Sequence, residues 1–192
     1  MQPYVSEHLY ACRKPPSYAN ADSYIPIAGA PHFYLPIRAS PAPSDLTTKL
    51  ADLLAKDPHS WKPVPIIHSL GLSTSFNWQA ATDSMDEWLT IADGSGRNTP
   101  FLWLGPNAAG HLKPPGKILQ EGNNALWHYN VEMGKEAMRR GVDNLGLYNM
   151  TLQASSWDGS NYGERVMVTQ AMMVSFLNVL CPILRLADTP SC

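Results

Sequence analysis

The segment SSWDGSNYGERV, residues 155–166, contains the carboxylate of a possible proton-transfer site but no histidine beside it. Asp158 is followed three positions later by Asn161. A carboxylate there can orient the imidazole of a histidine on the same loop, and an imidazole can take and return a proton near neutral pH. The side-chain amide of Asn161 has no titratable proton near neutral pH, so Asn161 cannot act as a general base. Asp158 and Ser160 could also cap a following helix.

Two other residues could supply the missing chemistry. His111, in the loop GHLKPP, is the best substitute base, although a lone histidine in a loop usually faces solvent. Ser23 follows Asp22, but the preceding PPSYAN does not read as a buried strand, which argues against Ser23 as a nucleophile.

Several side chains could contact a substrate. Aromatic faces stack on sugar C–H groups, so Trp157 and Tyr162 either line a sugar-binding edge or cover the sheet. Asn107 follows the apolar run FLWLG and is a candidate for substrate binding, as is Asn161. Asn123 stands where a helix is predicted to begin: an asparagine caps that helix, or the helix N-terminus holds an acyl or carboxylate oxygen.

Alternating helices and strands are predicted to position these loops. Apolar spacing predicts helices from Ser44 to Asp57, Ala80 to Ala92, Asn124 to Arg140 and Glu164 to Leu180, and apolar runs predict strands over 64–72, 100–105 and 142–150. Such alternation predicts an α/β fold with a mostly parallel sheet and helices on both faces. The loops SLGLSTSFN, LGPNAAGHLKPP and SSWDGSNYG follow strands, so we expect them to converge at the carboxyl ends of the sheet.

The first 43 residues differ in composition from the rest. They are rich in Pro, Ser, Ala and Tyr, which predicts an irregular arm with one short strand in PHFYLPI. The predicted organisation is an arm over 1–43, an α/β domain over 44–187 and a tail over 188–192. VPIIHSLGL is a continuous apolar run, which suits a strand covered on both faces. His68 within it is predicted to be a satisfied core histidine, and His128 to lie on a helix surface.

The bulk composition excludes some classes of function. Of 192 residues, 44% are apolar and 16% charged, which indicates a globular chain. The net charge of −2 gives no electrostatic reason to expect nucleic acid or an anionic membrane as partner. The three cysteines form no metal-binding spacing, and either they are free thiols or Cys12 pairs with one of the other two. The run AMMVSFLNVLCPILRLA is interrupted by polar residues and Pro182, so it predicts a buried helix rather than a membrane span, and no signal peptide is recognisable.

Three blocks then carry a resemblance to a known family. A strand ends in glycine at IIHSLGL, another leads into a Pro- and Gly-rich loop at FLWLGPNAAG, and the order helix, strand, D-G-S-x-Y, amphipathic helix follows. From about Leu46 to Leu180 the chain resembles the later part of an SGNH (GDSL-like) hydrolase, in the manner of the PC-esterase group of glycan O-acetyltransferases and acyl esterases. The resemblance implies that Asp158 matches the aspartate of a DGxHY block whose histidine is replaced by Asn161. It also implies that the Gly71 amide donates to an oxyanion, while the GDS nucleophile block has no counterpart.

The resemblance implies a carbohydrate esterase or O-acyltransferase relative that is catalytically degenerate. Its ligand would be a glycan or a small acylated substrate, with no cofactor and no metal, and the family would suit a secretory compartment. Two alternatives stay open: a non-catalytic glycan- or protein-binding module on the same scaffold, and a fragment of a larger enzyme.

Overall fold

The computed structural model describes residues 24–27, 30–55, 63–110 and 113–154, with side chains from residue 33 onward. The chain divides into two compact units, Met1–Ile37 and Arg38–Cys192. The helix predicted from Glu164 lies outside the described residues, as do all three cysteines.

The first unit contains a β-hairpin. β1 (Tyr24–Ile27) and β2 (Ala30–Phe33) are antiparallel, with Tyr24 opposite Phe33. The short strand predicted within PHFYLPI is therefore present as part of β2, and β1 is a second strand that the sequence pattern did not predict.

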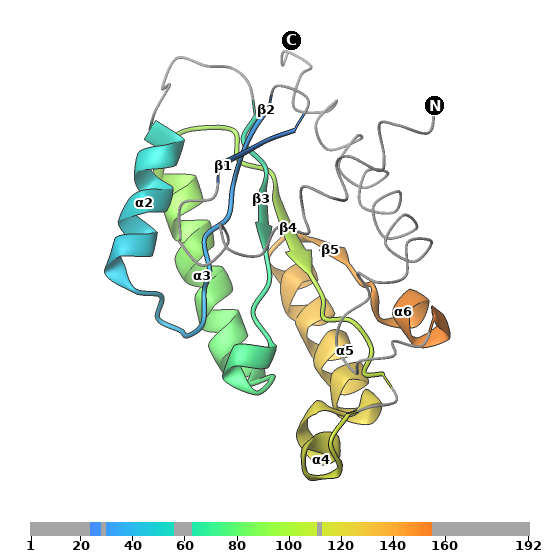
Figure 1. Ribbon diagram of the computed structural model, residues 1–192. Coiled ribbons are helices and arrows are strands. Elements are labelled where there is room, and N and C mark those ends of the chain that lie inside the picture. Colours follow the sequence, from blue (N-terminus) through green and yellow to red (C-terminus); the bar gives the residue numbers. More distant parts are fainter. Residues whose placement is uncertain (1–23, 28–29, 56–62, 111–112, 155–192) are drawn as a thin grey trace, which may run out of the picture. The chain divides into compact units, whose positions relative to one another are not determined.

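The second unit is built on a parallel sheet. Its described strands are β3 (Ile66–His68), β4 (Phe101–Leu104) and β5 (Asp143–Leu145), hydrogen-bonded in the order β3-β4-β5 (Figure 1). Ile66 is paired with Phe101, and Leu102 with Asp143. α3 (Trp78–Gly94) connects the first two strands and α5 (Asn123–Arg139) lies between the last two. Parallel strands joined through helices confirm the predicted α/β class.

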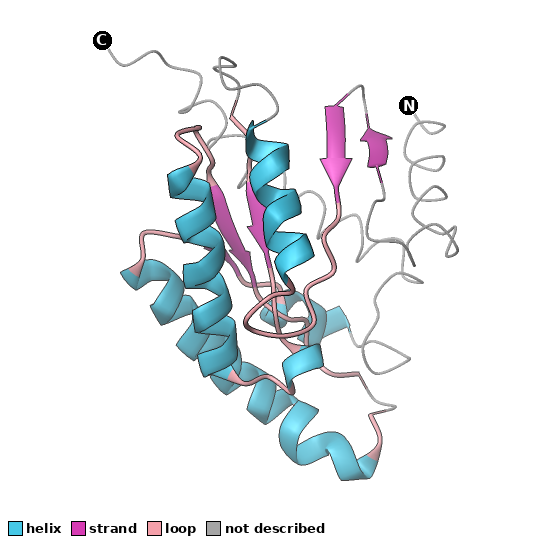
Figure 2. Ribbon diagram, turned by 90° about the vertical axis from the view of Figure 1, so that its left-hand side faces the viewer, coloured by secondary structure: helices cyan, strands magenta, loops and turns pink. Residues whose placement is uncertain are grey.

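The described helices form a packed layer beside this sheet. α2 (Ser44–Ala55) contacts α3, and α3 contacts α5. Figure 2, viewed from the side on which α2 and α3 lie in Figure 1, shows helices in front of the parallel strands. Because the crossover helices α3 and α5 contact each other, they share one face of the sheet, as successive right-handed connections between adjacent strands require.

Helical spacing of apolar residues explains this packing. α2 buries Leu46, Leu50 and Leu54, which repeat every four residues on one side of the helix, as predicted. The helices α3 and α5 bury residues at the same kind of spacing: Ala81, Met85, Trp88 and Ala92 in α3, and Leu126, Tyr129, Met133 and Ala137 in α5.

The helix ends follow from local chemistry. The side chain of Asn77 accepts a hydrogen bond from the Ala80 amide at 3.1 Å and caps α3. Gly141 has φ 68°, a left-handed conformation that glycine adopts without steric penalty, and α5 ends before it as predicted.

The structure corrects two predicted elements. The strand predicted over 142–150 ends at Leu145, and α6 (Tyr148–Ala154) replaces its second half and the start of the predicted loop. The buried residues Leu147, Tyr148 and Thr151 recur at helical rather than strand spacing, which explains the difference. The segment from the end of the predicted loop LGPNAAGHLKPP to α5 also forms two short helices, η3 (Pro115–Lys117) and α4 (Ile118–Glu121).

The coverage of the sheet also differs from the prediction in one place. Residues Phe101, Leu102 and Trp103 of β4 are all buried, as in a strand covered on both faces. In β3, Ile67 is 44% exposed between two buried neighbours, so the prediction of full coverage is wrong at that position.

Candidate functional site

The loop that follows β3 is held by the first half of α5. The Tyr129 hydroxyl donates to the carbonyl oxygen of Leu70. The ring of Phe76 meets the Tyr129 ring edge-on, with centroids 5.4 Å apart. Ser75 and Phe76 have φ of 50° and 56°, a left-handed conformation that is unfavourable for residues other than glycine. The packing of Phe76 against Tyr129 helps to hold that conformation.

The loop that follows β4 is held by side chains from outside it. The Asn123 side chain binds both backbone groups of Ala109: Oδ1 accepts from the amide at 2.7 Å and Nδ2 donates to the carbonyl at 3.1 Å. The Ala108 amide donates to the Thr151 hydroxyl of α6 at 2.8 Å. Nδ2 of Asn130 donates to the Pro106 carbonyl at 3.3 Å. The backbone of this loop is therefore held at Pro106, Ala108 and Ala109 by side chains of α5 and α6.

The segment that follows β5 completes the arrangement. The Tyr148 hydroxyl donates to the Asn123 carbonyl at 2.8 Å. Tyr148 also packs with Ala108 and Leu126, and Phe76 lies against that cluster. The segments that follow β3, β4 and β5 thus meet around the start of α5, as expected at the carboxyl ends of parallel strands. The third loop of the predicted convergence, SSWDGSNYG, lies outside the described residues, so its place there stays a prediction.

Gly71 lies where the loop after β3 begins to turn. Its carbonyl accepts hydrogen bonds from the amides of Thr74 and Phe76 at 3.0 and 2.9 Å. Within the described ranges its own amide donates to no acceptor, so this hydrogen-bond donor is unused there. A Cβ atom at Gly71 would lie 3.0 Å from Cε1 of Phe76, which leaves little room for a side chain.

Two of the three asparagines predicted to contact substrate, Asn107 and Asn123, lie in the described residues, and they differ in their surroundings. The Asn123 side-chain amide is engaged with Ala109, and Gly122 is the N-cap of α5, so the prediction that an asparagine caps this helix is wrong. Asn107 is partly buried, and no described group hydrogen-bonds to its side chain. Asn107 therefore keeps its hydrogen-bonding capacity, whereas Asn123 positions a loop.

His68 is a core residue, as predicted, but it is not a satisfied one. Its side chain is 1% exposed among the rings of Trp88, Phe101 and Trp103, whose centroids lie 5.4–5.7 Å away. Burial lowers the pKa of His68 to about 4. Its Nε2 is buried without a hydrogen-bond partner among the described residues, as is Nε1 of Trp88. A neutral, enclosed imidazole of this kind does not exchange protons with a substrate. His128 is exposed on α5, as predicted.

Two further groups were not identified from the sequence. Burial raises the pKa of Tyr129, so its hydroxyl stays protonated and serves as a donor to Leu70. Glu121, 7% exposed, pairs with Lys113 at 2.6 Å and with Lys117 at 3.4 Å. The hydrogen bond from Lys113 lowers the pKa of Glu121, despite the opposing effect of burial. The four-residue spacing of Lys117 and Glu121 was a signal that could have revealed part of this cluster.

The remaining predicted site residues lie outside the described residues: His111, Trp157, Asp158, Asn161, Tyr162 and Ser23. Their roles stay predictions. Across 24–27, 30–55, 63–110 and 113–154, no group of three or more His, Cys, Asp or Glu side chains could hold a metal ion. Of the helices in that portion, none has both the length and the apolar character needed to cross a bilayer.

Most polar side chains of the described site are used to hold its loops in place. The hydroxyls of Tyr129 and Tyr148 donate to backbone carbonyls, and the hydroxyl of Thr151 is bonded to backbone groups on both sides. Among the described residues these bonds hold the backbone, so the three hydroxyls position the loops. The backbone amide of Gly71 and the side-chain amide of Asn107 make no hydrogen bond within the described residues, and each can bind a polar group.

Comparison with solved structures gives a loose likeness. No protein-family model matches the chain, and no curated protein matches it in sequence. Among solved structures, the carbohydrate acetylesterase Est24 from Sinorhizobium meliloti superposes with a TM-score of 0.48 at 14% sequence identity, over 83% of this chain and 94% of that one. The acetylesterase activity named there is a property of Est24.

Proposed function

We propose that this chain is a degenerate relative of SGNH-type carbohydrate esterases, which binds an O-acylated glycan and does not turn it over efficiently. The observation that carries the proposal is the open amide of Gly71, at the point where the loops after the three parallel strands meet. A backbone amide at that edge can donate to the carbonyl oxygen of an acyl group, which is the donor that an oxyanion hole requires.

The loss of turnover follows from the residues that catalysis needs. A serine hydroxyl is a poor nucleophile unless a base lies within hydrogen-bond reach. The sequence has no GDS block, and Asn161 stands where the resemblance implies the base. His68 cannot act as the base in its place, because its side chain is enclosed among aromatic rings.

The proposed roles divide between binding and positioning. Gly71 donates to the acyl oxygen, Asn107 bonds a sugar hydroxyl, and Trp157 and Tyr162 stack on the sugar. Asp158 orients or polarises neighbouring groups, and His111 is the base on which any residual turnover would depend. Asn123 has an indirect role, because its side chain holds the backbone of Ala109, two residues before His111.

Binding tests the proposal directly. An O-acetylated xylo-oligosaccharide and its chemically deacetylated form can be titrated into the full chain by isothermal calorimetry. One hydrogen bond to the acyl carbonyl contributes about 1 kcal/mol, so we expect the acetylated ligand to bind about fivefold more tightly. Equal affinity for the two ligands, or no binding of either, would contradict the proposal.

Turnover gives the second arm. We expect hydrolysis of p-nitrophenyl acetate by the wild type to be no faster than in buffer, and unchanged in Ser23→Ala and His111→Ala. A rate well above buffer that Asp158→Ala abolishes would show a competent enzyme and overturn the degeneracy.

A further inference from the structure

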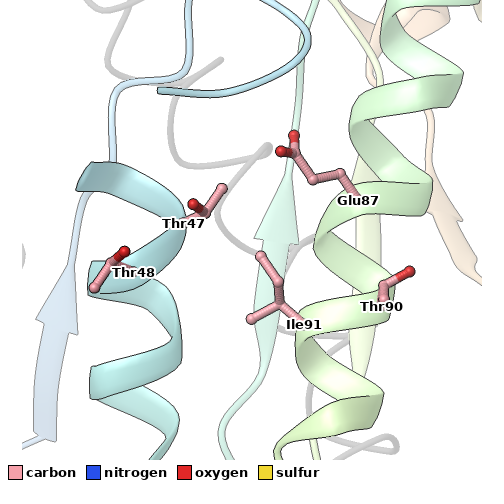
Figure 3. Close-up of a pocket in the computed structure, with 5 residues that line it drawn as sticks. All are labelled: Thr47, Thr48, Glu87, Thr90 and Ile91. Carbon is pink, nitrogen blue, oxygen red and sulfur yellow. The ribbon is translucent and has the colours of Figure 1, made fainter. Parts of the chain in front are cut away.

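A groove runs along the outer surface between α2 and α3. Its volume is about 480 Å³, and it is lined by Thr47, Thr48, Glu87, Thr90 and Ile91. Figure 3 shows Thr47, Glu87 and Ile91 between the two helices, with Thr48 and Thr90 at the outer margins. None of the five belongs to the loops that follow the strands, so this groove is a different place from the candidate site described above.

Two of the three threonine hydroxyls that line this groove offer acceptors rather than donors. The Thr47 hydroxyl donates to the Ser44 carbonyl at 3.0 Å, and the Thr90 hydroxyl donates to the Asp86 carbonyl at 2.7 Å. A hydroxyl has one proton to donate and two lone pairs to accept with. Because both protons are used within their own helices, a ligand in the groove meets lone pairs.

Glu87 adds a negative charge to the same wall. Its Oε2 accepts the Ala42 amide at 3.0 Å, and in the described part of the chain no cation pairs with this carboxylate. Oε1 is therefore left for a ligand. Asp83 precedes Glu87 by four residues, so it lies one turn away on the same side of α3 and adds a second carboxylate to that side.

We propose that this groove binds the guanidinium group of an arginine side chain from a peptide partner. A guanidinium carries five donors and no acceptor, which matches a wall made of carboxylate and hydroxyl lone pairs. Its planar fork matches a carboxylate, and its methylene stem packs against an apolar surface such as that of Ile91. The groove is open along its length, which suits a side chain that enters from a chain lying across α2 and α3.

The test uses a short capped peptide, acetyl-Gly-Arg-Gly-amide, and the same peptide with citrulline in place of arginine. Citrulline keeps the shape of the side chain and removes the charge. Titration into the nitrogen-15-labelled full chain, followed by NMR, should give saturable shifts at the amides of Thr47, Glu87 and Ile91 with the arginine peptide only. Added salt should weaken the binding, because the interaction is ionic.

Two variants identify the groups responsible. Glu87→Gln can still accept the Ala42 amide, so the fold is retained while the charge is lost, and we expect binding about tenfold weaker or more. Thr47→Val removes one acceptor with little change in shape, and it should weaken binding by a smaller factor. Asp93→Asn, an exposed carboxylate of α3 that does not line the groove, is the matched control and should bind as the wild type does.

Three results would overturn the proposal. The first is equal binding of the arginine and citrulline peptides, and the second is unchanged affinity in Glu87→Gln. The third is the absence of saturable shifts at the groove in the wild type. None of these three measurements depends on esterase activity or glycan binding. The result for the groove is therefore independent of the result for the proposed function.

Discussion

Acidification should destabilise this protein through one buried side chain, that of His68. The unfolded imidazole titrates near 6.5, whereas burial lowers the pKa in the folded state to about 4. Between those values the unfolded chain binds a proton that the folded chain does not, so the free energy of unfolding falls as the pH falls. The contribution is fully present above about pH 6.5 and is lost progressively down to about pH 4, below which no further loss follows.

The magnitude follows from the two pKa values. Each pH unit within the window costs about 1.4 kcal/mol, so the whole transition costs about 3 kcal/mol. The step from about pH 7 to about pH 5 accounts for about 2 kcal/mol of that loss. Contacts between an imidazolium and the rings of Trp88, Phe101 and Trp103 could return about 1 kcal/mol. Desolvation is the larger effect, and Nε2 has no described acceptor to offset it.

Urea denaturation at the two pH values measures this loss. Other titrating groups also contribute to the loss of unfolding free energy in the wild type. The contribution of His68 is therefore the difference between the losses of the wild type and of His68→Phe, a variant that keeps an aromatic ring but cannot titrate. We expect the variant to lose about 2 kcal/mol less than the wild type on acidification. His128→Gln, an exposed histidine of α5, is the control and should lose as much as the wild type. An identical loss in wild type and His68→Phe would refute the reasoning.

Two substitutions test how the loops and helix junctions are held. Thr151→Val removes the buried hydroxyl that accepts the Ala108 amide, so urea denaturation should show a loss of about 1–3 kcal/mol, which Thr151→Ser should largely avoid. Gly122→Ala would place a Cβ against the backbone carbonyl of Ile118 at the junction of α4 and α5, and a thermal melt should show a loss of about 1–3 kcal/mol. Gly116→Ala meets no neighbouring atom and should leave the melting temperature nearly unchanged; equal effects of the two alanines would contradict the steric argument.

The parts of the fold that the sequence predicted are those fixed by local periodicity. α2 has a leucine about once per helical turn, at Leu46, Leu50 and Leu54. These side chains lie on one side of the helix, and that side is buried. Gly141 ends α5 because a left-handed residue is needed there. The alternation of strands and helices was sufficient to predict the parallel sheet, and the sheet in turn brings its loops to one edge.

The missed parts depend on contacts between distant residues. α6 was read as strand and loop, yet Thr151 bonds Ala108, 43 residues earlier in the chain. An asparagine at the start of a helix looks like a cap in any sequence. Asn123 binds Ala109 instead of capping α5 because the loop after β4 passes beside it. The local sequence pattern around Asn123 does not predict the position of that loop. The sequence also did not show that Nε2 of His68 lacks a hydrogen-bond partner among the described residues. The surroundings of this imidazole depend on which residues of α3 and β4 enclose it.

The hold of Asn123 on Ala109 has a consequence for sequence change in the loop after β4. Both hydrogen bonds reach the backbone of Ala109, and the neighbouring bond from Thr151 reaches the backbone of Ala108. The path of this loop is therefore encoded largely outside it, by α5 and α6. Because Ala109 is bound through its backbone and is only partly buried, its side chain can vary in evolution while the loop keeps its course, whereas a change at Asn123 or Thr151 alters the course of a loop that it is not part of.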